Sequence, residues 1–152
     1  GAVKGFGIQL NGAVIDSSIK PWGPDNASAP LPDLSKKTAN ITLYYERYGF
    51  SVRVQEHYQG QTREYIVQFG PPNFAGLGSP NDGYSIEIPY HEIDAQIQYG
   101  FKSGPLKGLT LYIEGRNLNN APLVTYTNGD SRQLANWQKY GAAYRSGVSY
   151  KF

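Results

Sequence analysis

The last nine residues, 144–152, alternate between two kinds of side chain, and this period of two constrains the fold more than any other feature. Successive side chains of an extended strand point to opposite faces, so the segment is predicted to be a strand with two unlike faces. A chain that ends on an aromatic ring suits a membrane interface, where the ring meets the lipid boundary and the carboxylate meets water. An ordinary amphipathic terminal strand is the alternative. The first face carries Tyr144, Ser146, Val148, Tyr150 and Phe152, and the second carries Arg145, Gly147, Ser149 and Lys151.

Five earlier segments have the same period, which gives six predicted strands: 5–14, 39–46, 50–58, 90–101, 109–118 and 144–152. All ten prolines fall outside these segments, as expected when every strand must donate its N–H groups to a neighbour. Residues 47–49 form a tight turn in which Gly49 supplies a positive φ. The chain is therefore predicted to be all-β.

The connections between these strands alternate in length: 15–38, 59–89 and 119–141 are long, whereas 47–49 and 103–108 are short. Within 59–89, residues 65–69 are apolar enough to extend a strand or to form a small hairpin above the sheet. Strands joined in this way form an antiparallel up-and-down meander with all long loops at one end and both short turns at the other. The C-terminus then lies at the short-turn end. Transmembrane β-barrels are built in this way. A soluble sandwich that turns its polar face to water has the same pattern and stays an alternative.

Composition excludes several other classes of protein. The chain has 152 residues, enough for one domain, and no run of 18 apolar residues that would predict a transmembrane helix. It lacks cysteine, which excludes disulfides and thiolate chemistry, and its net charge of +2 is too small to indicate a nucleic-acid partner. A mean hydropathy of −0.49 is compatible with a barrel, because only every second strand residue meets lipid. Because methionine is absent even at position 1, we expect a processed chain or a piece of a longer one.

Three segments together resemble the C-terminal part of the TonB-dependent outer-membrane receptors. Residues 41–53 (Ile-Thr-Leu-Tyr-Tyr-Glu-Arg-Tyr-Gly-Phe-Ser-Val-Arg) resemble the family's late hairpin, in which a Tyr-Glu strand end turns through Gly-Phe. Residues 111–120 (Leu-Tyr-Ile-Glu-Gly-Arg-Asn-Leu-Asn-Asn) resemble its penultimate strand, and Gly147 to Phe152 resemble the closing strand of outer-membrane barrels, which typically ends in Phe. One departure is visible, because Ala142 follows Gly141 where the family often has Gly-Arg.

The resemblance implies that residues 1–152 are about six C-terminal strands of a larger, 22-stranded transmembrane barrel, without the plug domain and the earlier strands. It implies an integral outer-membrane protein with a periplasmic C-terminus that binds and imports a scarce substrate, either an oligosaccharide or a metal chelate such as a siderophore. Tyr150 and Phe152 correspond to the family's assembly signal. The implied partners are the rest of the barrel and its plug, the TonB complex through the missing N-terminal part, the barrel-assembly machinery, and outer-membrane lipid with lipopolysaccharide. A small soluble all-β binding module and an outer-membrane barrel enzyme are the alternatives.

Residues that could carry chemistry are few. His57 and His91 are the only histidines and both are assigned to the polar face; Glu92 and Asp94 lie near His91 but alternate with it, so no metal site and no metal cofactor are predicted. No Gly-x-Ser-x-Gly pattern points to a hydrolase, and we expect no enzymatic activity. Lys36 and Lys37 are predicted to lie at the start of a strand and to face water. A contact to lipopolysaccharide phosphate is the alternative.

Aromatic residues in the long loops are the best candidates for binding a ligand. They would gather at one mouth together with amide, carboxylate and guanidinium groups, a combination that suits sugars, peptides or aromatic chelators. Near-neutral loops favour a glycan over a strongly anionic chelate. The alternative is that these rings pack the loops together or form an interfacial girdle. The predicted ligand-binding residues are Trp22, Tyr65, Tyr84, Tyr126, Arg132 and Trp137.

Overall fold

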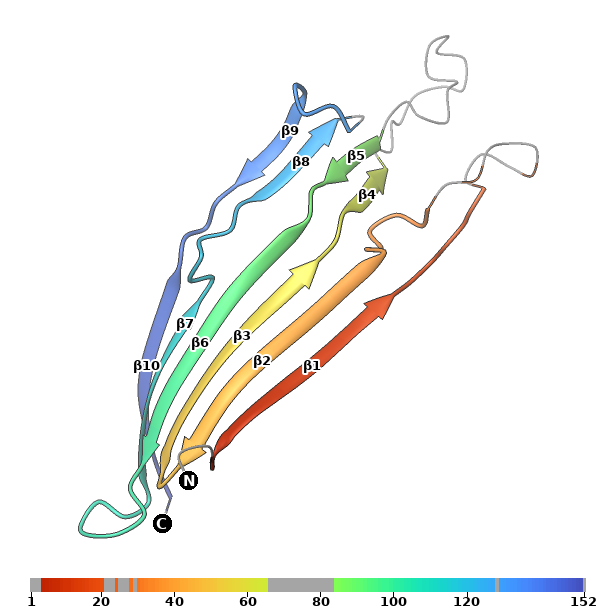
Figure 1. Cartoon of the computed structure of the whole chain (residues 1–152). Helices are drawn as coiled ribbons and strands as arrows, with labels where there is room; N and C mark the ends of the chain where they lie inside the picture. The colour runs from red at the N-terminus through yellow and green to blue at the C-terminus, as the bar shows by residue number, and fades with distance from the viewer. Residues whose placement is uncertain are drawn as a thin grey trace.

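The computed structural model describes residues 4–20, 24, 28, 30–65, 84–127 and 129–151, except for the side chain of Tyr65. Their strands form two antiparallel sheets (Figure 1). The larger sheet has the order β1-β2-β3-β6-β7-β10, formed by Phe6–Val14, Lys37–Arg47, Phe50–Gln59, Tyr90–Gly100, Leu109–Arg116 and Ala143–Tyr150. The smaller sheet has the order β4-β5-β8-β9, formed by Thr62–Tyr65, Tyr84–Glu87, Leu123–Thr127 and Leu134–Gln138.

The smaller sheet prolongs the larger one. Strand β4 follows β3, β5 precedes β6, β8 follows β7 and β9 precedes β10, and the four keep the order of the strands that they prolong (Figure 1). The six predicted strands and their up-and-down order are confirmed, and the short β2–β3 and β6–β7 turns lie at one end with both chain ends (Figure 1). The end with the smaller sheet is called the loop end below, and the opposite one the turn end.

Two of the predicted long loops are wrong in part, because they contain strands. Residues 59–89 include β4 and β5, and residues 119–141 include the β8–β9 hairpin. The overlooked signal is local: the β-branched and aromatic run 123–127 is followed by Asn-Gly at 128–129, the pair most typical of a tight hairpin. These strands are only four or five residues long, so polar and apolar residues alternate over too few positions to indicate a strand.

Cross-strand register places the apolar residues of the larger sheet on one side, here called the apolar face. Residues directly opposite one another share a face. One row runs across the sheet as Phe6, Tyr45, Val52, Ile97, Ile113 and Ser146, and the next as Ile8, Leu43, Val54, Ala95, Gly115 and Tyr144. The alternation predicted for each strand is therefore confirmed in the larger sheet, because the apolar residues of neighbouring strands share one face.

The opposite side of the larger sheet, here called the polar face, holds paired charges and amides. Glu114 accepts hydrogen bonds from Arg116 Nε at 2.8 Å and from Arg145 Nη2 at 2.7 Å. Farther toward the loop end, Asn40 donates to Asn11 at 2.8 Å and lies 2.6 Å from His57 Nδ1. The placement of His91 on this side is wrong: it lies opposite Tyr58 on the apolar face, 3.3 Å from Glu56.

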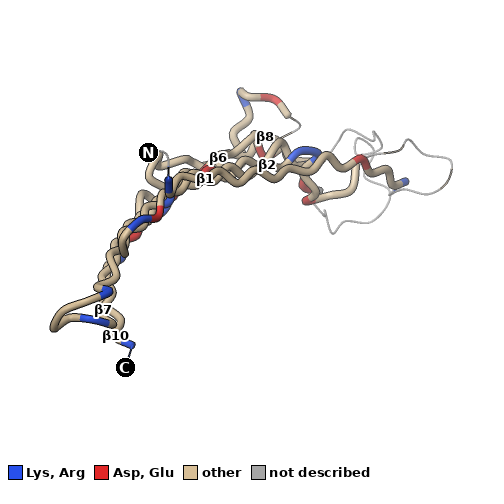
Figure 2. The backbone as a smooth tube through the Cα atoms, turned by 60° about the horizontal axis from the view of Figure 1, so that its bottom comes forward, with Lys and Arg blue, Asp and Glu red and all other residues tan. Residues whose placement is uncertain are grey.

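The two sheets form one thin, bent layer when viewed nearly edge-on, with acidic and basic positions intermingled (Figure 2). Within the described part of the chain, Val124 is the one hydrophobic residue that is buried. On the apolar face, by contrast, Phe6 is 67% exposed, Ile113 61% and Val148 66%. The described residues include no helix long and apolar enough to cross a membrane. A layer of this kind has no core of its own, so its apolar face needs a partner or an apolar solvent.

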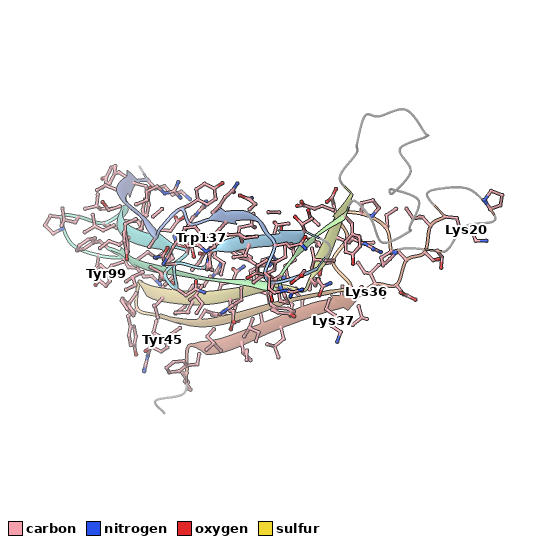
Figure 3. The ribbon with its side chains drawn as sticks, turned by 90° about the horizontal axis from the view of Figure 1, so that it is seen from above. Lys20, Lys36, Lys37, Tyr45, Tyr99 and Trp137 are labelled. Atoms are coloured by element: carbon pink, nitrogen blue, oxygen red, sulfur yellow. The ribbon has the colours of Figure 1, made fainter. Side chains whose placement is uncertain are left out.

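Aromatic rings gather on the apolar face at the turn end. The ring centroids of Phe6 and Tyr45 are 4.6 Å apart, and those of Tyr99 and Phe101 are 4.9 Å apart and perpendicular. Figure 3 shows Tyr45 and Tyr99 at this end of the sheet and Lys20, Lys36 and Lys37 at the other. The turn between β2 and β3 has positive φ at both Tyr48 (52°) and Gly49 (90°), as a tight hairpin requires.

Candidate functional site

The structure brings three predicted ligand-binding residues onto the smaller sheet. Tyr84 begins β5, Tyr126 lies in β8 and Trp137 lies in β9. Arg132 lies in the turn between β8 and β9, outside the sheet. Tyr65 ends β4 opposite Tyr84, but its side chain lies outside the described part of the structure, and Trp22 lies outside the described residues.

Register shows that these three rings share one side of the smaller sheet. Ile86 lies opposite both Arg63 and Tyr126, and Val124 lies opposite Trp137. Because side chains two residues apart on a strand point the same way, Tyr84 joins Ile86, and Val124 joins Tyr126. This side, here called the ring face, carries Arg63, Tyr84, Ile86, Val124, Tyr126 and Trp137.

The ring face is the continuation of the polar face. In the larger sheet Gln59 lies opposite Tyr90, and in the smaller sheet Thr62 lies opposite Glu87, three residues farther along both strands. Because three residues separate the paired positions on both strands, side chains continue to alternate between the two sides in the same order across the interruption. Arg63 therefore lies on the same side as His57 and Gln59, whereas Thr62 lies on the same side as Val54 and Tyr58.

Polarity therefore reverses where the two sheets meet. With Leu123 as an apolar exception, the side that is apolar in the larger sheet continues mainly as hydroxyl, carboxyl and amide side chains: Thr62, Glu64, Ser85, Glu87, Thr125, Thr127, Asn136 and Gln138. The side that is polar in the larger sheet continues as the ring face. Strand structure is interrupted at each place where the polarity reverses, at residues 60–61, 88–89, 117–122 and 139–142.

Asparagine side chains bridge one of these breaks. The amide oxygen of Asn119 accepts from the Ile93 N–H at 3.0 Å, and its amide nitrogen donates to the His91 carbonyl at 2.9 Å. Asn117, with φ of 51°, accepts from the Ala121 N–H at 2.8 Å and donates its own N–H to Asp94 at 2.9 Å. The two Asn119 bonds satisfy backbone groups of β6 that β7 no longer reaches, and the two Asn117 bonds hold the connection between β7 and β8.

Arg63 and Tyr84 make the closest contact on the ring face. The Arg63 guanidinium carbon lies 3.7 Å from the centre of the Tyr84 ring, which is cation–π geometry. A methyl group at Gly129 would lie 3.4 Å from Ile86 and 3.9 Å from the Tyr84 hydroxyl, so the β8–β9 turn lies against this face. The sequence analysis did not single out Arg63 as a site residue; its position beside Tyr84 is visible only in the register.

Arg132 is engaged within its own turn. Its Nη2 donates to Asp130 Oδ2 at 2.7 Å, its Nε donates to Asp130 Oδ1 at 3.0 Å, and its backbone N–H donates to the same Oδ1 at 3.0 Å. These bonds lower the pKa of Asp130 and raise that of Arg132. The Arg132 side chain is still 85% exposed, so it keeps N–H groups that can reach a ligand.

On the opposite side of the smaller sheet, Glu87 lies near two other carboxylates. Burial raises the pKa of Glu87, and the negative charges of Glu64 and Asp33 raise it further. Among the described residues there is no group of three or more His, Cys, Asp and Glu that could hold a metal ion.

A cleft of about 530 Å³ lies where the two sheets meet, beside the segment that leads into β2. Lys36, Lys37 and Arg63 line it together with Tyr58, Tyr84 and Leu34. The loop end therefore offers two features: the ring face and, next to it, a cleft that these basic and aromatic side chains line.

Comparison of the chain with models of protein families, with curated proteins and with solved structures found no match.

Proposed function

We propose that this chain is the C-terminal wall of an energy-coupled outer-membrane receptor of the TonB-dependent class, with a 22-stranded barrel. The observation that carries the proposal is the reversal of polarity between four strands of the larger sheet and the short strands that prolong them. Lipid requires apolar side chains outside the barrel and a lumen tolerates polar ones, whereas an extension above the membrane has water outside. The exposed apolar face, the paired charges behind it and the hydroxyl-rich side of the smaller sheet support this arrangement.

Strand length supports the same proposal. A tilted transmembrane β-strand needs about 9–11 residues. Strands β1, β2, β3 and β6 have 9, 11, 10 and 11 residues. The aromatic residues Phe6, Tyr45 and Tyr99 on the apolar face are then the girdle at the periplasmic interface.

The proposed role of the ring face is to bind substrate at the extracellular mouth. It lies on the lumen side of this arrangement, and it combines three rings with the guanidinium group of Arg63. Aromatic surfaces with a few directed polar groups suit an oligosaccharide or a metal chelate such as a siderophore. In this proposal the chain catalyses no reaction.

Accessibility along one strand tests the membrane arrangement. The chain has no cysteine, so single cysteines at Ile41, Leu43, Thr42 and Tyr44 can be spin-labelled in the intact protein reconstituted into vesicles. Labels at Ile41 and Leu43 are expected to be accessible to oxygen dissolved in lipid, and labels at Thr42 and Tyr44 to a water-soluble nickel reagent. A protein that stays soluble and monomeric without detergent, with no alternation, would favour a soluble all-β binding module instead.

The chain end is proposed to act in assembly. Tyr150 ends β10 and is 53% exposed, and Phe152 lies outside the described residues. Deletion of Phe152 is expected to lower the amount of receptor in the outer membrane while uptake per assembled receptor stays near that of the parent. Unchanged membrane levels would contradict this role.

A further inference from the structure

Positive charge gathers at the turn end of the larger sheet, where both short turns and both chain ends lie (Figure 1). Basic positions lie beside both chain ends (Figure 2). The segments that meet at this end contain Glu46 as their only acidic residue: 1–15, 46–55, 95–113 and 144–152. Even with a terminal carboxylate at Phe152, basic groups outnumber acidic ones. The basic residues of the turn end are Lys4, Arg47, Lys102, Lys107 and Lys151.

None of these five basic side chains forms an ion pair within the described part of the chain. Arg47 contacts a neutral group instead. Its Nη2 donates to the Tyr48 hydroxyl at 3.0 Å, and its guanidinium carbon lies 4.6 Å from the centre of the Tyr48 ring. Tyr48 is 77% exposed, so this contact leaves the charge of Arg47 near the solvent. The positive charge of the turn end is therefore open to an anionic ligand.

A hollow of about 650 Å³ lies between the two short turns at this end. Its lining includes Glu46, Ser51 and Gln98, which lie opposite one another on the polar face of the sheet. The hollow is therefore reached from the side opposite the apolar face. The basic residues that line it are Arg47, Lys102 and Lys151.

Hydrogen bonds between the turns and the last strand fix the walls of this hollow. The Gly100 N–H donates to the Gly49 carbonyl at 2.8 Å, and the Lys151 N–H donates to the Gly108 carbonyl at 3.0 Å. Gly49 and Gly108 have φ values of 90° and 93°, and a methyl group on either would collide with the carbonyl oxygen of Gly100 or Lys151. Glycine thus permits the close approach of the turns, which fixes the backbone of Lys102 relative to that of Lys151.

The lining combines the groups that an acidic peptide needs. Ammonium and guanidinium groups bind carboxylates. The Gln98 amide and the Thr110 hydroxyl have no hydrogen-bond partner in the described part of the chain, and they can both donate and accept, as peptide N–H and C=O groups require. Phe50 and Leu109 add apolar surface. The volume is much larger than a single inorganic anion needs, and a lipid would have to reach the side of the sheet opposite the apolar face.

We propose that the hollow at the turn end binds a short acidic peptide segment of a partner protein. Two carboxylates of the segment pair with Lys102 and Lys151, and Arg47 with the exposed Tyr48 ring lies at the rim. The proposal goes beyond the proposed receptor function and does not depend on it, because all of these residues belong to one sheet and its turns. In the proposed membrane arrangement the turn end faces the periplasm, so the partner is a periplasmic protein.

The test titrates the intact protein, in detergent micelles, into a dye-labelled peptide of sequence Glu-Ala-Glu-Ala. Alternate side chains of an extended peptide point the same way, so both carboxylates can face the two lysines. We expect a saturable rise in fluorescence anisotropy that weakens with added salt. The double variant Lys102→Gln/Lys151→Gln is expected to raise the half-saturation concentration at least ten-fold. The matched control is Lys36→Gln/Lys37→Gln, which removes the same charge from the loop end and is expected to leave the titration unchanged.

A neutral peptide, Gln-Ala-Gln-Ala, tests the role of the carboxylates and is expected to bind at least ten-fold more weakly. Equal binding of the two peptides, or no saturable binding of the acidic one, would overturn the ligand class. A half-saturation concentration within two-fold of the parent in Lys102→Gln/Lys151→Gln would overturn the site.

Photo-cross-linking separates a partner peptide from an acidic segment of the same protein. Benzoylphenylalanine in place of Tyr48 puts the reactive ketone at the rim of the hollow. We expect it to label the acidic peptide, and excess unlabelled peptide to suppress the labelling. Cross-linking to another part of the same protein in place of the peptide would overturn the assignment to a partner.

Failure of this site is distinct from failure of the proposed function. A protein that inserts into vesicles with alternating accessibility along β2, but binds no acidic peptide, overturns the peptide site alone. A protein that is soluble without detergent and shows no such alternation, but binds the acidic peptide through Lys102 and Lys151, overturns the membrane arrangement and supports the peptide site.

Discussion

The strands of the smaller sheet prolong four strands of the larger one, but the side that is apolar in the larger sheet is mostly polar in the smaller sheet. In the larger sheet, Leu43 and Ile97 lie on the side that Glu64 and Glu87 continue in the smaller one. On the other side, the Glu114–Arg145 ion pair belongs to the face that continues as Tyr126 and Trp137. Both sheets are antiparallel, so the type of strand pairing does not explain the difference. In the proposed membrane arrangement the surroundings of each face explain it, and the reversal marks the level at which lipid gives way to water.

The largest effect is expected from a charge on the apolar face. Leu43 lies midway along β2 and is 54% exposed. In the proposed membrane arrangement Leu43 lies near the bilayer midplane, so Leu43→Arg is expected to lower the free energy of unfolding in lipid vesicles by roughly 2–4 kcal/mol. Urea titration followed by tryptophan fluorescence measures it.

The matched controls for Leu43→Arg separate the two sheets. Gln55→Arg places the same charge on the polar face, and Glu64→Arg places it on the same side as Leu43 but in the smaller sheet. Both are expected to change the free energy of unfolding by less than about 0.5 kcal/mol, as for ordinary surface substitutions. An equal cost for Leu43→Arg and Glu64→Arg would show that the reversal does not mark the edge of the lipid.

A smaller effect is expected at the break between the sheets. Asn119→Ala removes the hydrogen bonds of this side chain to Ile93 and His91. At about 0.5–1.5 kcal/mol for each bond, the loss should total about 1–3 kcal/mol. Asn11→Ala, which removes a single exposed bond to Asn40, is the control and should cost less. Hydrogen exchange at the amides of β6 and β8 locates the change; protection lost evenly over both sheets would contradict a local role.

The ring face is expected to contribute a comparable but smaller free energy to ligand binding. In the proposed receptor, replacing Tyr126 and Trp137 together with Ala should weaken binding of the imported ligand by ten-fold or more, about 1.4 kcal/mol. Isothermal titration on the purified receptor, with uptake assays to identify the ligand, measures it. Replacing Tyr45 and Tyr99 at the turn end is the control, since these rings lie on the apolar face. Affinity within two-fold of the parent in the Tyr126/Trp137 variant would assign these rings to loop packing or a girdle.

The smallest effect concerns pH at the loop end. Because burial, Glu64 and Asp33 raise the pKa of Glu87 in the folded state, the folded protein binds this proton more tightly than the unfolded chain does. The smaller sheet should therefore gain stability as pH falls from neutral through the raised pKa, and lose it again as pH rises. Glu87→Gln should remove that dependence. Comparing hydrogen exchange of the parent and the variant at each pH isolates this group, and a difference that is constant with pH would contradict the prediction.

Alternation was sufficient to predict the larger sheet from the sequence. Strands of eight to eleven residues repeat the pattern often enough to define both faces, and short turns such as Tyr48-Gly49 fix which strands are neighbours. Four- and five-residue strands do not repeat it enough, which is why β8 and β9 were assigned to a loop despite the Asn-Gly pair at 128–129. His91 was assigned to the wrong face because a polar residue was expected to lie on the polar side.

By itself, the sequence determined that the chain is all-β, that six strands run up and down, and that Leu43 and Ile113 share a face, because these properties depend on local alternation and turn chemistry. Only the tertiary structure decided that the pairing of β3 with β6 continues as the pairing of β4 with β5 across residues 60–61 and 88–89, because register depends on the partner strand. That continuation determines the side on which Tyr84, Tyr126 and Trp137 lie. It also brings Lys36 and Lys37 to the same cleft as Arg63, across a separation in sequence that local patterns do not span.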